Sequence, residues 1–438
     1  MIKLTNSCVG KREIFDIKNE TVQLYVCGIT PYDYTHIGHG RCYVLFDVLY
    51  RYLRSIGVKV IYCRNFTDID DKLLCKAQEL YGDQFQYKKV ADAFIENYLQ
   101  DMESLNCLFP DYQPRVTEVI DDIIEFIDGL IKKNCAYVVN GDVYFSVKNF
   151  PEYGQLSKRK LDQLCAGARV DINEQKRDPL DFALWKAGAE GTFWKSPWGW
   201  GRPGWHIECS VMAYKNLGKT IDIHGGGMDL IFPHHENEKA QSEALWNQSF
   251  ARVWMHVAFV QINKEKMSKS LGNFFTLREL FNKFDPMVIR FYLLSHHYRS
   301  PIDFSLEELD RADKVYRKLC KIFAQKQCAL EGSSCEIKKY PIMEKIINFI
   351  EDDLNTVGIW GVIFEHAQTM ADEFCGIKGF VQNILGLTLE ILPEPIVCIT
   401  PEMQELIEKR QKARAAKDWA MADTLREELK TLGYEVQD

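Results

Sequence analysis

Hydrophobic runs of strand length alternate with helical patterns in the first part of the chain. These runs lie near residues 22–27, 58–64 and 219–223, and a helical repeat from Arg41 to Leu53 follows the first of them. Such alternation predicts an α/β fold, in which a Rossmann-like parallel sheet binds its ligands at the carboxyl ends of the strands. From Leu306 onward the apolar spacing is helical almost to the end, which predicts a C-terminal α-helical region.

The same pattern predicts how the chain divides into domains. A length of 438 residues is enough for several hydrophobic cores. The expected parts are the sheet domain in two halves (1–113 and 201–250), a connective insertion (114–200), a linking fold (251–310), a helical bundle (311–400) and a short terminal region (401–438).

The composition indicates the cellular compartment of the protein. The N-terminus lacks the apolar core of a secretory signal, and no run approaches the ~20 apolar residues of a membrane span. The fourteen cysteines include no Cys-x-x-Cys pair, which favours reduced thiols. We therefore expect a cytoplasmic protein without a membrane partner, and a monomer, because no dimer surface is evident in the pattern.

A first motif, Thr-His-Ile-Gly-His-Gly at residues 35–40, lies between the first strand-like run and the helical repeat. A helix N-terminus offers unpaired N–H groups to phosphates, and His36 and His39 add further donors. Gly38 lets the backbone approach a flat ligand closely. A histidine pair beside glycine is also found in ordinary turns, so this motif alone is weak evidence for a phosphate site.

A second motif, Lys-Met-Ser-Lys-Ser at residues 266–270, places Lys266 and Lys269 in a polar segment that is followed by Gly272. This pattern predicts a cationic loop that stabilises the charge on a pyrophosphate leaving group. On its own it equally fits a solvated surface loop, and only the two motifs together, in this order, are specific.

Four residues form a candidate metal site, namely Cys27, Cys209, His234 and Glu238. Cys27 ends the first strand-like run, and Cys209 lies in a predicted turn at the edge of an apolar element. The last two are four residues apart and share one face of a predicted helix, although His235 satisfies the spacing to Glu238 as well. Thiolate, imidazole and carboxylate ligands together suit zinc better than magnesium or calcium. By spacing alone, these residues are more simply read as unrelated side chains in a cysteine-rich chain.

The two motifs resemble those of the class I aminoacyl-tRNA synthetases, and the stretch from Tyr25 to Asn273 resembles cysteinyl-tRNA synthetase. The resemblance rests on Arg-Pro-Gly-Trp-His-Ile-Glu-Cys-Ser at 202–210, Asp-Ile-His-Gly-Gly-Gly at 222–227 and Phe-Pro-His-His-Glu-Asn-Glu at 232–238. It implies one Zn²⁺ held by the four candidate ligands, and L-cysteine, ATP with Mg²⁺, and tRNA(Cys) as substrates. It also implies that the C-terminal helices lie along tRNA and that residues 401–438 bind the anticodon.

The resemblance further implies a role for each residue of the site. The histidine pair stabilises the phosphates, Lys266 and Lys269 follow the leaving pyrophosphate, and tRNA then accepts cysteine from the adenylate. The expected adenosine-binding residues are Gly225, Gly226 and Gly227, in a loop predicted to follow the run 219–223, and Asp229 beyond it. The expected residues next to the cysteine substrate are Cys27, Thr67 and Trp205, although the spacing of Trp205 fits core packing equally well. Zinc lowers the pKa of a coordinated thiol, so serine competes poorly and no editing domain is expected.

The net charge of −8 offers RNA no overall attraction, so contacts must come from local basic faces. Two are present in the helical region, although charged helix faces are usually just solvated. They comprise Arg311, Lys314, Lys318 and Lys321, and then Lys409, Arg410, Lys412, Arg414 and Lys417. Two alternatives to the synthetase remain: a cysteine ligase of the mycothiol type, which lacks a tRNA-binding region, and a noncatalytic zinc- and RNA-binding relative.

Overall fold

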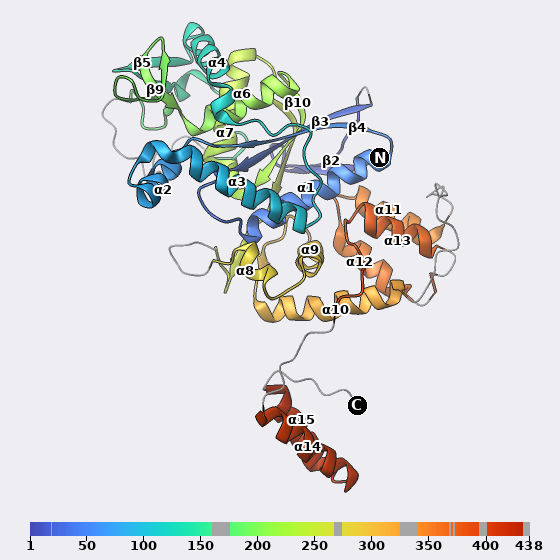
Figure 1. The fold of residues 1–438 in the computed structure, drawn as a ribbon. Helices are drawn as coiled ribbons and strands as arrows, with labels where there is room; N and C mark the ends of the chain where they lie inside the picture. Colours follow the sequence, from blue (N-terminus) through green and yellow to red (C-terminus); the bar gives the residue numbers. More distant parts are fainter. Residues whose placement is uncertain are drawn as a thin grey trace. The chain divides into compact units, whose positions relative to one another are not determined.

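The structure is a computed structural model that describes residues 1–18, 20–159, 176–266, 274–324, 340–367, 369–370, 373–393 and 401–431. It divides into two compact units, Met1–Glu390 and Ile391–Asp438, which we describe one at a time (Figure 1).

A four-stranded parallel sheet forms the centre of the first unit. Its strand order is β11-β10-β3-β4, with every neighbouring pair parallel. The strands are β3 (Thr21–Ile29), β4 (Lys59–Phe66), β10 (Ile221–Gly227) and β11 (Ala251–Val257). Because all four run the same way, their carboxyl ends meet at one edge, where ligands bind in such sheets. The predicted parallel-sheet fold is therefore confirmed.

Helices cover both faces of this sheet. Figure 1 shows α1 (Ile37–Ser55) on one side and α6 (Trp205–Leu217) with α7 (Glu236–Trp246) on the other. On α1, Val44, Phe46 and Val48 are almost fully buried, so the sheet is covered by apolar side chains, as expected for parallel strands.

The structure corrects three local predictions. The first helix begins at Ile37 and not at Arg41, because His36 caps it. The glycine run 225–227 belongs to strand β10, although the pattern predicted a loop. Gly225 fits there because a Cβ would lie 2.2 Å from the Phe46 ring. Cys209 lies in helix α6 and not in a turn.

An antiparallel sheet of order β5-β6-β7-β9-β8 lies between α4 (Ile120–Lys132) and α6 along the chain. Its strands are β5 (Ala136–Val139), β6 (Asp142–Phe145), β7 (Phe182–Ala187), β8 (Trp194–Ser196) and β9 (Gly199–Pro203). The elements before it are α2 (Asp71–Tyr81), η1 (Gln84–Gln86), α3 (Tyr87–Ser104) and η2 (Val116–Glu118), with η3 (Val147–Asn149) after β6. The expected boundaries of the insertion stay a prediction.

A small sheet of order β13-β12-β14 follows the central sheet. It contains β12 (Val260–Ile262), β13 (Glu265–Lys266) and β14 (Ile302–Asp303), with α8 (Leu277–Phe281) and α9 (Pro286–Leu294) between the last two strands. At the N-terminus, β1 (Lys3–Asn6) pairs with β2 (Lys11–Ile14). Thr5 of β1 donates two hydrogen bonds to Asp353, both at 2.7 Å, and so joins the start of the chain to the helical region.

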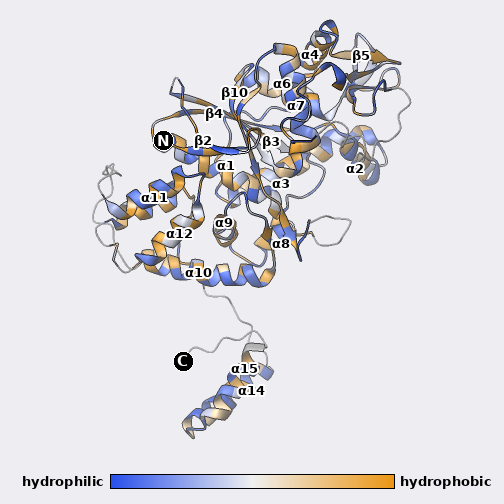
Figure 2. Cartoon of the chain, turned by 180° about the vertical axis from the view of Figure 1, so that it is seen from behind, coloured by the Kyte–Doolittle hydropathy of each residue, from blue (hydrophilic) through white to orange (hydrophobic). Residues whose placement is uncertain are grey.

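Helices complete the first unit, as the apolar spacing predicted. They are α10 (Leu306–Ala324), α11 (Pro341–Glu351), α12 (Thr356–Glu365) and α13 (Phe374–Asn383). Figure 2 shows hydrophobic and hydrophilic positions side by side on α10, the pattern of a helix with one buried face. Leu309, Tyr316 and Phe323 are buried on that face.

The second unit is a hairpin of two helices, α14 (Pro401–Ala415) and α15 (Trp419–Thr431). Met403, Ala413, Ala422, Leu425 and Leu429 are buried between them, whereas most other positions are exposed. No helix among the described residues is both long and apolar enough to span a membrane.

Candidate active site and metal centre

A pocket of about 600 Å³ opens at the carboxyl ends of the parallel strands. Its wall includes the end of β3, the first turn of α1, the start of α6 and the junction between β11 and β12. Among the predicted site residues, it is lined by Cys27, His36, Gly38, His39, Trp205, Gly227 and Asp229. Segments far apart in the sequence therefore meet around one cavity.

His36 and His39 start helix α1 as a reciprocal cap. The backbone N–H of His39 donates to Nδ1 of His36 at 3.3 Å, and that of His36 donates to Nδ1 of His39 at 3.4 Å. Their rings stack with centroids 3.7 Å apart. With Nδ1 of each ring accepting, Nε2 carries the proton. Burial lowers the pKa of His39 to about 4, so this ring is a neutral donor at pH 7.

The second motif lies mostly outside the described residues, Lys269 included. Lys266 ends strand β13 and pairs with Gln261 of β12, but its side chain is outside the described part of the structure. The segment that follows the second motif contacts the first motif. His36 forms a β-bridge with Thr276, and its ring lies edge-on to Phe274 at 5.1 Å. The described segment that follows the second motif thus lies against the first motif.

The four candidate metal ligands are gathered in one buried cluster next to the pocket. One ligand atom from each of Cys27, Cys209, His234 and Glu238 lies within 4.8 Å of all the others. Sγ of Cys27 is 3.9 Å from Sγ of Cys209 and 3.4 Å from Oε1 of Glu238. Nε2 of His234 is 3.0 Å from the same oxygen. Strand β3, helix α6 and the turn before α7 each supply part of the cluster.

These residues fit a zinc ion. Bonds of ~2.0–2.3 Å in a tetrahedron put ligand atoms roughly 3.3–3.8 Å apart, close to the separations seen here. Polar groups buried this deeply also need a compensating partner. Burial raises the pKa of the Cys27 thiol well above its ordinary value and lowers the pKa of His234 to about 3. A second grouping, Cys27, His224, His235 and Glu238, meets the same distance criterion, so geometry leaves two sets open.

Three residues that the sequence analysis did not select surround the cluster. His224 lies with Nε2 2.8 Å from Oε2 of Glu238. His256 bonds Nδ1 of His235, whose Nε2 is 3.3 Å from the sulfur of Cys27. Asn65 accepts from the backbone N–H of Gly28 at 2.9 Å. Hydrogen bonds of this kind orient ligands around metal ions. Single histidines inside buried strands carry no local signal that would have identified them.

Trp205 is the first residue of α6 and remains 39% exposed, although its spacing fitted core packing equally well. Its indole stacks on the His234 ring with centroids 4.3 Å apart. One aromatic side chain therefore lines the pocket and also contacts a candidate ligand.

Thr67 is buried and does not line the pocket; its hydroxyl donates to Glu208 at 3.1 Å. Burial raises the pKa of Glu208 well above its ordinary value. Asp70 caps helix α2 by accepting from the Lys72 N–H at 2.9 Å, whereas Asp68 accepts from the N–H and hydroxyl of Thr117.

Within the glycine run, only Gly227 lines the pocket, together with Asp229 in the following turn η4 (Met228–Leu230). Gly226 packs near the His235 ring, where a Cβ would lie 2.8 Å from Cε1. The turn η5 (Ile231–His235) then leads into α7 and places His234 and Glu238 on one face.

Two protein-family models match the chain. The model described as "tRNA synthetases class I (C) catalytic domain" matches residues 13–314, and "Cysteinyl-tRNA ligase anticodon binding domain" matches residues 399–438. The first match covers the sheet, the pocket and the cluster. The fold and site thus define a class I aminoacyl-tRNA synthetase.

Curated relatives match along the full length. The cysteine–tRNA ligase of Caldicellulosiruptor saccharolyticus is 46% identical and aligns with 100% of this chain and 98% of its own. That of Persephonella marina is 43% identical with the same coverage, and the chloroplastic/mitochondrial enzyme of Zea mays is 44% identical over 100% of this chain and 84% of its own. The chain belongs to the cysteine–tRNA ligase family.

Solved structures with low sequence identity support the fold. A Mycobacterium tuberculosis methionyl-tRNA synthetase in complex with methionyl-adenylate aligns with a TM-score of 0.57 at 13% identity, covering 85% of this chain and 88% of its own. A leucyl enzyme of Agrobacterium radiobacter aligns with a TM-score of 0.57 at 11% identity, covering 86% of this chain and 83% of its own.

Proposed function

We propose that this cysteine–tRNA ligase selects its amino acid at the buried cluster and activates it in the adjoining pocket. The observation that carries the proposal is the position of Cys27. It belongs to the cluster of possible metal ligands and also lines the pocket that His36 and His39 line. A cysteine bound there would have its side chain at the cluster and its carboxylate toward the phosphate-binding turn.

Zn²⁺ is the ion that the donor set favours, one per chain, held by Cys27, Cys209, His234 and Glu238. When bound, it lowers the pKa of a coordinated thiol, so cysteine is favoured over serine by far more than a methyl-sized contact would allow. Around it, His224 orients Glu238. Trp205 covers His234 and excludes water from the cysteine side of the pocket.

In the first step, the cysteine carboxylate attacks the α-phosphorus of ATP, and pyrophosphate leaves with its Mg²⁺. The His36–His39 pair at the start of α1, with His39 neutral at pH 7, stabilises the phosphates. Lys266 and Lys269 neutralise the departing pyrophosphate. The ribose and adenine bind beside the glycine run 225–227 and Asp229. No general base is needed, because the carboxylate is already ionised at pH 7.

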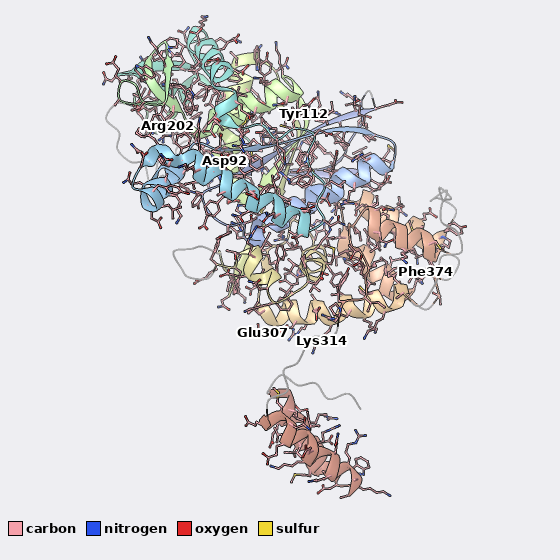
Figure 3. All side chains as sticks on the ribbon, in the orientation of Figure 1. Asp92, Tyr112, Arg202, Glu307, Lys314 and Phe374 are labelled. Atoms are coloured by element: carbon pink, nitrogen blue, oxygen red, sulfur yellow. The ribbon has the colours of Figure 1, made fainter. Side chains whose placement is uncertain are left out.

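In the second step, a terminal ribose hydroxyl of tRNA(Cys) attacks the carbonyl carbon of the adenylate, the bond from this carbon to the phosphate oxygen breaks, and AMP leaves, its phosphate accepting the hydroxyl proton. Two basic surfaces are available for the RNA. On α10, Arg311, Lys314, Lys318 and Lys321 are all exposed, and Figure 3 labels Lys314. On α14, Lys409, Lys412 and Arg414 are exposed, and Lys417 follows just beyond it. Arg410 is buried in the hairpin, so it does not belong to this surface. That the enzyme works as a monomer in the cytoplasm stays a prediction.

The anticodon-binding family match at residues 399–438 favours the tRNA enzyme over a mycothiol-type cysteine ligase, which has no use for such a domain. A noncatalytic relative would have no chemical use for the histidine pair at the pocket.

The test is cysteine-dependent exchange between pyrophosphate and ATP, with serine as competitor, followed by transfer of labelled cysteine to tRNA(Cys). We expect exchange that disappears when zinc is removed and returns on its addition, together with charging of tRNA. Exchange without charging would identify a small-molecule ligase. Absence of exchange in the zinc-loaded chain would contradict the proposal.

A further inference from the structure

Arg41 lies in the first turns of α1, directly after the phosphate-binding turn, and is 3% exposed. No carboxylate lies within ion-pair distance of its guanidinium among the residues that the structure describes. Instead, the guanidinium donates to backbone carbonyls of two segments. In the first, Nη1 reaches Ala258 at 2.9 Å and Phe259 at 2.8 Å. In the second, Nη2 reaches His297 at 3.1 Å, Tyr298 at 3.5 Å and also Ser300.

A buried cation that is bound only by neutral carbonyls is costly unless all of them stay in place. Burial lowers the pKa of Arg41 to about 10, and Nε has no hydrogen-bond partner. The guanidinium therefore holds the two segments against α1, and a shift of either one would leave part of this buried charge without acceptors.

One of the two segments lines the pocket, and the other packs against it. Ala258 and Phe259 line it. The next residue begins β12, which pairs with β13, the strand that ends at Lys266. Residues 297–300 lead into β14, which pairs with the other edge of β12, and the Ala258 N–H donates to the Tyr298 carbonyl at 2.8 Å.

We propose that Arg41 is a positioning residue for ATP. It fixes the distance between the helix turn that carries His36 and His39 and the β11–β12 junction, which line the pocket from two sides. The planar fork of arginine suits this role, because it presents five donors in one plane, whereas lysine carries three at a single point. The inference rests on the proposed function only in taking ATP as the ligand of the pocket.

The test is Arg41→Lys in the full chain, with kinetics of cysteine-dependent pyrophosphate exchange. We expect the KM for ATP to rise about tenfold or more, since displacement by a fraction of an ångström already weakens positioning. The KM for cysteine should stay within about twofold, because the cluster is not held by Arg41.

Arg290→Lys is the control. Arg290 is also buried and also binds carbonyls, those of Leu105 and Leu385 at 2.7 Å each, but it forms an ion pair with Asp47 as well, and none of these three residues lines the pocket. Its replacement should lower the Tm without changing the KM for ATP. If the KM for ATP rises equally in both variants, or in neither, Arg41 has only a structural role.

Should Arg41→Lys fail to fold, amide hydrogen exchange of the unaltered chain tests the same idea. ATP should slow exchange in residues 257–262 and also in 297–300, which do not line the pocket but share the guanidinium. Protection that stops at residue 262 would overturn the inference. An unaltered chain that binds ATP but shows no cysteine-dependent exchange would contradict the proposed function and leave this test intact.

Discussion

The metal cluster and the C-terminal hairpin differ in the sequence separation of their contacts and in the burial of their polar side chains. The cluster joins residues up to 211 positions apart, and each of its four side chains is at most 4% exposed. The hairpin joins two neighbouring helices, keeps most of its charged side chains in solvent, and includes local pairs such as Lys409–Glu405 at 2.8 Å. Polar groups that are buried together interact strongly, because the protein interior has a low dielectric constant, so the loss of one of them has a large effect. Exposed charges on a locally formed hairpin suit a surface that binds a flexible polyanion.

The largest effect is expected for Cys209→Ser. The hydroxyl is a poor zinc ligand, so the variant should lose its metal, and cysteine-dependent exchange should fall about 10³-fold or more. Metal content measured by atomic absorption checks the first expectation and pyrophosphate exchange the second.

Cys320→Ser is the control for this change. Cys320 is equally buried, in α10, but is not part of the cluster. A full zinc content and normal exchange in Cys209→Ser would show that the cluster does not select the amino acid.

His39→Ala should lower the kcat of exchange about 10²–10³-fold, the usual cost of losing one preorganised donor. His39→Asn should recover at least a tenth of the loss, because a neutral amide also donates. If the asparagine variant is no better than the alanine variant, donation by a neutral group is not what His39 contributes.

His39 should also make the stability of the fold depend on pH. Burial lowers the pKa of His39 from 6.5 to about 4, so the unfolded chain binds this proton more readily. Its contribution to stability should be complete above pH 6.5 and fall as the pH drops toward 4. Urea unfolding of the parent and of His39→Asn across this range measures the difference in slope.

A comparison of His234→Asn with His235→Asn decides between the two sets of ligands. We expect the first to lose zinc and the second to bind it about 10–100-fold more weakly, as for other residues that orient a ligand. Competition with a chromogenic chelator measures both affinities. The reverse order would assign the metal to the set with His224 and His235.

The smallest effect is expected in the hairpin. Lys412→Glu with Lys417→Glu should raise the KM for tRNA about tenfold and reduce the salt dependence of binding by about two phosphate contacts. Pyrophosphate exchange should not change, which is the internal control. A loss of exchange would show that the hairpin contributes to the chemistry and that the contrast between the two regions is wrong.

The local spacing of residues was enough to predict part of the fold and of the site from the sequence alone. The parallel sheet, the helical C-terminal region and the shared helix face of His234 and Glu238 follow from periods of two and 3.6 residues. The same spacing left His235 as an alternative to His234, and it did not reveal that His36 caps the first helix. The motif pair and the cysteine-bearing stretches indicated the family, because short segments with a chemical role keep recognisable residue types in order.

Only the tertiary structure decided which distant residues meet. It brought Cys27 next to Cys209, surrounded the cluster with Asn65, His224 and His256, and placed Gly225 in a strand against Phe46. It also gave Arg41 five carbonyl partners from two segments. These contacts depend on which buried groups can satisfy one another once strands and helices pack, and sequence spacing holds no information about that choice.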